Sequence, residues 1–201
     1  MLKKCPNFLV LGSSSPYRAE ILSNIAVNFI QMAPNFPEHV LPNESPESTV
    51  MRLAYGKALS LDVKLKQYVI VSSDQVAHQG ERIFNKPENY ASAFKQLKQF
   101  QGEWVSFTTS LCLLTHDGKE KAAIETFEVK FRCLSEKEIE RYLNIDSPYD
   151  CAGSIKVESA GLTLLEDARG RDINCVYGLP VMLLREELAS LKLDLLDFTK
   201  A

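Results

Sequence analysis

Apolar positions follow two different periods along this chain, and each period predicts its own kind of element. Continuous apolar runs at residues 8–11 and 68–71, bounded by turn-forming residues, predict two buried strands. Other segments repeat apolar residues every three or four positions, which predicts helices. The predicted helices begin at Pro16 with Ser15 as N-cap, extend from Ser45-Pro46 to Leu61, and cover residues 89–100 and 181–191.

The middle of the chain alternates apolar and polar residues instead. Residues 104–134 alternate in this way around the turn sequence His116-Asp117-Gly118-Lys119, which predicts two long antiparallel strands joined by a hairpin. The sequence Ser135 to Glu138 is a capping box, which predicts a helix that extends through Leu143. The apolar run Leu162 to Leu165 predicts a further strand.

These elements predict a mixed α/β sheet flanked by helices, with two lobes around a central cleft. Residues 33–47 hold four of the nine prolines and predict a long loop, a kind of segment that is usually functional or disordered. Sheets of this class bind ligands at the carboxyl ends of their strands. We therefore expect candidate sites at residues 12–18 and 72–75.

Composition narrows the choice of partners. The 201 residues carry a net charge of −3 with acids and bases interspersed, which argues against a protein that coats nucleic acid. No apolar run approaches the ~18 residues of a membrane span. Five cysteines without a C-x-x-C pair fit a reducing compartment, so we expect a cytoplasmic protein. Cys112 and Cys133 lie in apolar runs and are expected in the core.

The stretch "LGSSSPYRAEIL", Leu11 to Leu22, is the first candidate for chemistry. The start of a helix presents unpaired N–H groups that bind phosphate, and Arg18 would add a planar bidentate donor. The stretch is not a Walker loop, because it lacks that motif's lysine. On local sequence alone, an ordinary strand, turn and serine-capped helix explains it better.

Charged residues in three other segments are further candidates. Asp74 follows an apolar strand, where it is a metal ligand, a general base, or simply a polar residue at a turn. Lys57 interrupts the apolar face of a predicted helix, and Lys86 precedes a proline; each binds an anion or extends to solvent. Glu38 is a loop acid, and Cys151–Ser159 forms a pocket wall or a tight connection.

The order of these pieces resembles the Maf family of nucleotide pyrophosphatases. The chain reads S-x-S-P-x-R, a loop glutamate, A-x-x-K-A, S-D-Q, K-P, A-G-S and G-L-P, from Leu9 to about Leu184. The resemblance implies one domain over residues 1–201, with an α/β fold shared with the inosine-triphosphate pyrophosphatases. It also implies that a nucleoside triphosphate is hydrolysed between its α- and β-phosphates, with a divalent cation, Mg²⁺ or Mn²⁺.

The resemblance also assigns roles to single residues. Ser13 and Arg18 match the family's phosphate-binding start, and Lys57 and Lys86 match its phosphate-facing lysines. Glu38 matches a loop acid on the metal side. Asp74 matches the acid that accepts a proton from water, although the sequence leaves open which acid binds metal and which is the base.

Three differences from most of the family resemble the branch that acts on 7-methyl-GTP. These are Tyr17 before Arg18, Gln75 after Asp74, and a glutamate at position 158. Methylation at N7 makes guanine cationic, so an aromatic face and a carboxylate would both attract it. Tyr17 is then the stacking residue, although that branch usually has Trp there, with Glu158 reading the base and Gln75 as a polar partner.

Other readings stay open. The chain could hydrolyse dTTP and UTP, the sister activity of the family, or could be a non-catalytic nucleotide-binding regulator of cell division. Under each reading its partner is a small nucleotide, with neither nucleic acid nor a membrane involved. Family resemblance is also compatible with a homodimer.

Overall fold

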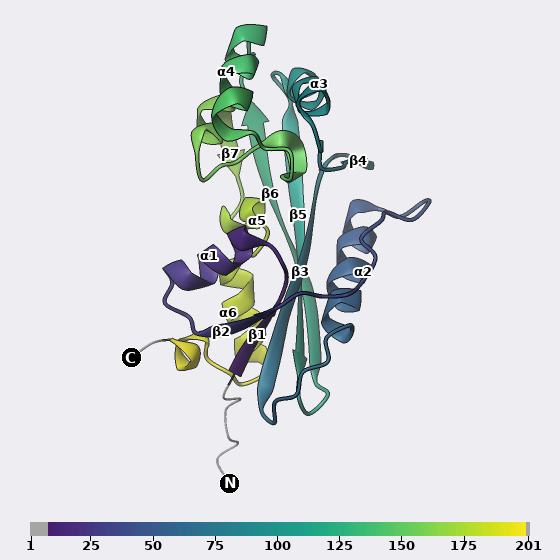
Figure 1. Cartoon of the computed structure of the whole chain (residues 1–201), viewed down its shortest axis with the longest axis vertical. Helices are drawn as coiled ribbons and strands as arrows, with labels where there is room; N and C mark the ends of the chain where they lie inside the picture. The colour runs from purple at the N-terminus through teal and green to yellow at the C-terminus, as the bar shows by residue number, and fades with distance from the viewer. Residues whose placement is uncertain (1–7, 200–201) are drawn as a thin grey trace.

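A computed structural model describes residues 8–199, whose strands form one seven-stranded mixed sheet (Figure 1). The strand order is β2-β1-β3-β5-β6-β7, and β4 pairs with β3 beside this path. β1 is parallel to both β2 and β3, whereas the other pairs are antiparallel. The strands are β1 (Phe8–Gly12), β2 (Phe29–Met32), β3 (Tyr68–Gln79), β4 (Arg82–Phe84), β5 (Trp104–Thr115), β6 (Glu120–Phe131) and β7 (Leu165–Arg169).

Helices cover both faces of this sheet, and serine caps begin three of them. Ser15, Ser45 and Ser135 each accept a hydrogen bond from a backbone N–H in the first helical turn, and Ser135 completes the predicted capping box with Glu138. The helices are α1 (Pro16–Asn24), α2 (Pro46–Leu59), α3 (Tyr90–Phe100), α4 (Glu136–Asp146), α5 (Asn174–Tyr177) and α6 (Val181–Ser190), with 3₁₀ helices η1 (Ala152–Ser154), η2 (Ala160–Leu164) and η3 (Leu195–Phe198).

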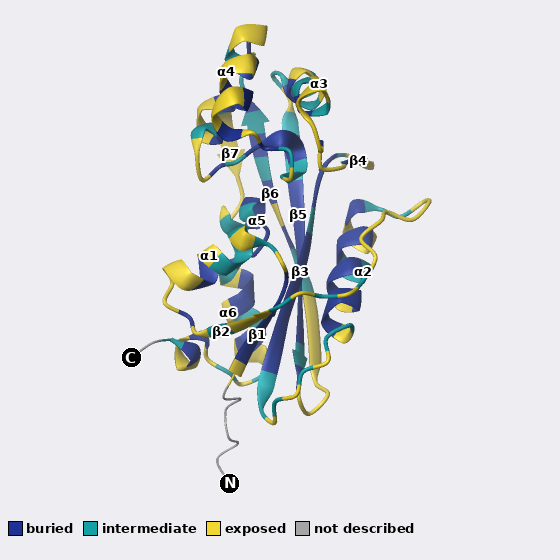
Figure 2. Ribbon diagram, viewed as in Figure 1, coloured by how far each residue is buried: buried dark blue, intermediate teal, exposed yellow. Residues whose placement is uncertain are grey.

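The two faces of the sheet bury different helices because strand side chains alternate. Val10 and Ile70 pack against α2, whereas Leu9 and Val71 on the same strands pack against α1 and α6. A third cluster lies at the other end of the sheet, beneath α3 and α4. Figure 2 shows the result, with buried strands at the centre and exposed outer helix faces. The predicted mixed α/β sheet with flanking helices is confirmed.

One strand is much longer than the sequence predicts. β3 continues from Tyr68 to Gln79, so Asp74 lies inside a strand and the expected strand end at residues 72–75 is wrong. The polar run Ser72 to Gln75 stays in the sheet because β5 pairs with it along its whole length. β1 does end at Gly12, opposite Ser72. Asp74 therefore lies two residues beyond the point at which β1 stops.

Two other predictions are wrong. Of the strand predicted over Leu162 to Leu165, the first three residues form the end of η2, and β7 begins only at Leu165, since a short apolar run does not distinguish a strand from a buried helical turn. Cys112 is buried as expected, but Cys133 is exposed because it follows the end of β6. Cys5 lies outside the described residues.

The other predicted segments agree with the structure. The hairpin pairs Trp104 with Lys130 and Leu114 with Glu120. Residues 33–45 have no helix or strand, as the long loop predicted. β2, β4, α5 and η3, which are all short, were not predicted from the sequence. No helix within residues 8–199 has the length and apolar character to cross a membrane.

Candidate active site

A cleft of about 700 Å³ opens where β1 ends beside β3. Its walls come from the start of α1, the loop before α2, the inner face of α2, the middle of β3, and the segment after β4. Glu158 is the only predicted site residue that does not line this cleft. The eight that do are Ser13, Tyr17, Arg18, Glu38, Lys57, Asp74, Gln75 and Lys86.

Lys57 joins two carboxylates at the centre of the cleft. Its Nζ lies 2.6 Å from Asp74 Oδ1 and 2.7 Å from Glu38 Oε2. The Lys57 and Asp74 side chains are only 4% and 7% exposed, whereas that of Glu38 is 51% exposed. α2 buries this lysine on its apolar face, which is tolerated because both acids compensate the charge. The shared contact also brings the two carboxylates close together.

Glu38 is ionised in this setting. Burial favours its neutral form, but the hydrogen bond and charge of Lys57, together with the charges of Lys86 and Arg18, outweigh burial and lower its pKa. A carboxylate thus stands at the mouth of the cleft, on the loop for which the sequence left a functional and a disordered segment as alternatives.

Arg18 is a partly buried cation that forms no ion pair with the acids of residues 8–199. Its Nε donates to the Gly178 carbonyl at 2.8 Å, and its Nη1 donates to Ser13 Oγ at 3.2 Å. None of the ion pairs found between residues 8 and 199 includes it. Burial lowers its pKa, and the charges of Asp74 and Glu38 oppose that effect. A partly buried guanidinium without an ion pair in the described part of the chain, beside the start of α1, can bind an anionic ligand.

Tyr17 lies at the other side of the helix start. Its hydroxyl donates to Asp150 Oδ2 at 3.3 Å, and the ammonium of Lys156 lies 5.8 Å from the centre of its ring. Burial, followed by the neighbouring Cys151 and the charges of Asp150 and Glu158, raises the pKa of its hydroxyl. The ring therefore already contacts a cation on one face.

Gln75 and Glu158 differ in how they relate to the cleft. Gln75 lines it, and its side-chain amide donates to the Cys175 carbonyl. Glu158 is an exposed residue beyond the lining, although its charge acts on Tyr17. Partial desolvation, together with Asp146 and Glu20, raises the pKa of Glu158 against the opposing charge of Lys156.

Comparison with known proteins shows which family the chain belongs to. The Maf-like protein family model matches residues 8–191. This chain belongs to the Maf family. A Maf relative from Nitrosococcus oceani is 43% identical over 184 residues, which is 91% of this chain and 92% of the relative, and is named 7-methyl-GTP pyrophosphatase. Relatives from Alcanivorax borkumensis and Pseudoalteromonas atlantica carry the same name; each is 42% identical, covering 90% and 94% of this chain and 93% and 97% of their own.

Solved structures resemble this Maf chain only in part. The Staphylococcus aureus Ham1 protein matches 62% of this chain and 72% of its own at 13% identity, with a TM-score of 0.40. A dITP/XTP pyrophosphatase from Mycobacterium abscessus matches 61% and 73% at 16% identity, with a TM-score of 0.36.

The Maf site offers two acids to a cation. Across the described residues there is no group of three or more His, Cys, Asp and Glu side chains placed to hold a metal ion. Mg²⁺, however, is commonly bound by one or two carboxylates together with water and substrate phosphate oxygens. Glu38 and Asp74 meet at Lys57 Nζ, so this donor set fits such a cation.

Several contacts of the Maf site were not anticipated from the residues alone. Asp150 and Tyr177 also line the cleft, and the Gly178 carbonyl holds Arg18. Ser73 Oγ donates to the same Gly178 carbonyl at 2.6 Å. The G-L-P motif of the resemblance was the only signal that pointed to this segment.

Proposed function

We propose that this Maf protein is a nucleoside triphosphate pyrophosphatase that converts 7-methyl-GTP to 7-methyl-GMP and pyrophosphate. The names of its relatives support this activity. The observation that carries it is one cleft in which Arg18, which forms no ion pair within residues 8–199, lies near Lys57 and its two carboxylates. Such a site has cations for a polyphosphate and acids for a metal ion and for water.

The cationic end of the cleft would hold the triphosphate. Arg18, Lys57, Lys86 and the N–H groups at the start of α1 neutralise its charge, and Ser13 keeps the Arg18 fork in place. Charge on the pyrophosphate leaving group grows as the anhydride bond breaks, so fixed cations stabilise the transition state more than the ground state.

Asp74 is the group that would accept a proton from the attacking water. Its ion pair with Lys57 keeps one oxygen occupied and fixes the carboxylate against the floor of the cleft. Glu38 and Asp74 would hold Mg²⁺ or Mn²⁺, which supplies charge neutralisation at the phosphates. The oxygen of the attacking water would bond to phosphorus as the α–β anhydride bond breaks and pyrophosphate leaves, and the water proton would pass to the Asp74 carboxylate.

The other side of the helix start would recognise the base. Tyr17 offers an aromatic face, and the carboxylate of Glu158 attracts a positively charged purine from outside the cleft. Gln75, fixed by the Cys175 carbonyl, is the polar partner between base and phosphates. A cationic base is favoured over a neutral one by both the ring and the acid.

A substrate panel tests the proposal. Pyrophosphate release from 7-methyl-GTP, GTP, dTTP, UTP and CTP would be measured with Mg²⁺ and with Mn²⁺, and we expect 7-methyl-GTP to give the highest kcat/KM. Asp74→Asn should abolish most of that turnover. A preference for dTTP or UTP would contradict the base assignment, and nucleotide binding without pyrophosphate release would favour a regulator instead.

A further inference from the structure

Backbone carbonyls in the turn between β7 and α6, residues 170–180, accept hydrogen bonds from two side chains of the cleft, Arg18 and Gln75. The carbonyl of Gly178 accepts from Arg18 Nε and from Ser73 Oγ. The carbonyl of Cys175 accepts from the Gln75 amide and, at 2.8 Å, from Thr109 Oγ1. The orientation of both site residues therefore depends on where two backbone carbonyls of this turn lie.

Gly178 has a conformation that brings its carbonyl close to Arg18. Its φ is +91°, in the left-handed region, and a Cβ at this position would lie 3.1 Å from Arg18 Nε. A side chain here would crowd the guanidinium as well as strain the backbone. The turn and Arg18 thus fit each other closely.

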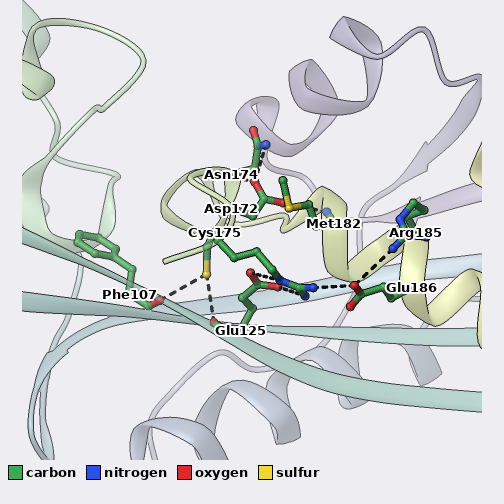
Figure 3. Close-up of polar contacts among 9 residues, drawn as sticks. Phe107, Glu125, Asp172, Asn174, Cys175, Met182, Arg185 and Glu186 are labelled. Carbon is green, nitrogen blue, oxygen red and sulfur yellow. Dashed lines mark hydrogen bonds and ion pairs between the residues drawn. The ribbon is translucent and has the colours of Figure 1, made fainter. Parts of the chain in front are cut away.

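Asp172 forms hydrogen bonds near both ends of this turn (Figure 3). Its Oδ1 accepts from the backbone N–H and the side-chain amide of Asn174, at 2.9 and 2.8 Å, where α5 begins. Its Oδ2 accepts from the backbone N–H of Met182 at 2.9 Å, in the first turn of α6. One carboxylate, only 4% exposed, caps two helices and encloses the turn between them.

Neither helix has a cap of its own. Ile173 and Pro180 stand at the cap positions of α5 and α6 and make no side-chain cap hydrogen bond. Asp172 replaces both caps from a single position. Its negative charge also lies at the start of α6, where the helix dipole favours it, and a charged acceptor makes stronger hydrogen bonds than a neutral one.

We propose that Asp172 is a positioning residue of the active site, which acts through the turn 174–178 to orient Arg18 and Gln75. Within residues 8–199, none of its side-chain hydrogen bonds reaches Arg18, Gln75 or a residue that lines the cleft. The inference rests on the proposed function only in assigning Arg18 to the phosphates. Arg18 orientation itself can be measured without any turnover.

Asp172→Asn is the most direct variant, because it keeps the shape and the Oδ1 acceptor but replaces Oδ2 with an amide that cannot accept from Met182. We expect kcat/KM for 7-methyl-GTP to fall about 10- to 100-fold, since small misplacements of a positioning group have effects of this size. The Kd for inorganic tripolyphosphate should rise by about tenfold or more for the same reason.

Hydrogen exchange at Arg18 Nε reports on the tether directly. In the wild-type protein this N–H is bonded to Gly178 and should exchange slowly, as its NMR signal would show after assignment with Arg18→Lys. Asp172→Asn should speed this exchange. Glu186→Gln is the matched control, because it breaks an exposed ion pair with Arg171 beside the same turn and leaves Asp172 untouched.

The outcomes separate the two proposals. Unchanged Arg18 exchange and unchanged tripolyphosphate affinity in folded Asp172→Asn would overturn the positioning role, even if the melting temperature falls. A wild-type protein that releases pyrophosphate from no nucleotide would overturn the proposed function. Faster exchange and weaker binding in Asp172→Asn, with Glu186→Gln like wild type, would support the positioning role in either case.

Discussion

At the residue scale, Lys57 has both a structural role and a proposed catalytic role. It compensates one buried and one half-exposed carboxylate, so its removal would leave two like charges facing each other. The same ammonium would also face the triphosphate. Structure and proposed chemistry thus meet at one side chain, which the sequence singled out because it interrupts an apolar helix face.

We expect Lys57→Met to lower kcat/KM by roughly 100-fold or more, the usual scale for losing a charge-stabilising group in an active site. Glu38, whose pKa lies below its ordinary 4.5 in the wild type, should regain a higher pKa without Lys57. The acid limb of the pH–rate profile should then move to higher pH. In the wild type, the ion pair between Glu38 and Lys57 stabilises the fold above pH 4.5, and this stabilisation is lost as the pH falls through the lowered pKa of Glu38.

The control for this change is Lys66→Met, which removes an exposed lysine outside the cleft. It should leave both kcat/KM and the acid limb unchanged. An acid limb that stays in place in Lys57→Met would contradict the assignment of that limb to Glu38.

At the scale of elements, the loop before α2 has a few hydrogen bonds of its own, between Leu41 and Glu44, and is also held by contacts with the helix. Arg52 Nη2 donates to Glu44 Oε2 at 2.7 Å and to the His39 carbonyl at 2.9 Å. The Phe36 ring lies directly on Gly56, where a Cβ would come within 2.2 Å of it. These contacts bring Glu38 to Lys57 although its segment has no helix or strand.

Gly56→Ala tests this contact. The added methyl group collides with the Phe36 ring, and overpacking of this kind costs about 1–3 kcal/mol of unfolding free energy. We also expect kcat to fall, since displacement of the loop moves Glu38. Urea unfolding and pyrophosphate release would measure the two effects.

The double variant Phe36→Ala/Gly56→Ala is the internal control. With the ring removed, alanine at position 56 should be neutral or stabilising relative to Phe36→Ala alone, because alanine favours a helix interior by about 1 kcal/mol over glycine. Equal destabilisation in both backgrounds would mean that the Phe36 contact is not what requires glycine.

For the whole molecule, the cleft joins segments that lie far apart in the sequence. Its lining extends from Ser13 through Lys86 to Asp150 and Tyr177 and draws on both faces of the sheet. A ligand bound there would connect α1, α2 and β3 and stabilise the fold as a unit. The cytoplasmic location, the homodimer and the single domain over residues 1–201 stay predictions.

Ligand binding should therefore raise the melting temperature. The ligand would be an α,β-methylene analogue of 7-methyl-GTP in the presence of Mg²⁺. At an analogue concentration of about 100 times its Kd for the wild type, binding adds about 2.7 kcal/mol of unfolding free energy. For a chain of this size that corresponds to a rise of roughly 5–11 °C. Calorimetry on the wild type and on Arg18→Leu would measure it, and an equal rise in both would place the ligand away from Arg18.

Interactions between residues that are close in the sequence determine many elements of this protein, and the sequence alone determined those elements. Helix periods, serine caps, the capping box at Ser135 and the alternating hairpin each depend on residues within a few positions of one another. Order along the chain was enough to indicate the family, because its motifs are spread over nearly all of it.

Only the tertiary structure decided how those pieces meet. Asp74 lies within β3 because β5 pairs with the polar run around it, and that register depends on residues more than 30 positions away. No local pattern shows that Lys57 contacts both acids, or that Arg18 stays outside the ion pairs of residues 8–199. Likewise, only the fold brings the starts of two helices to the carboxylate of Asp172.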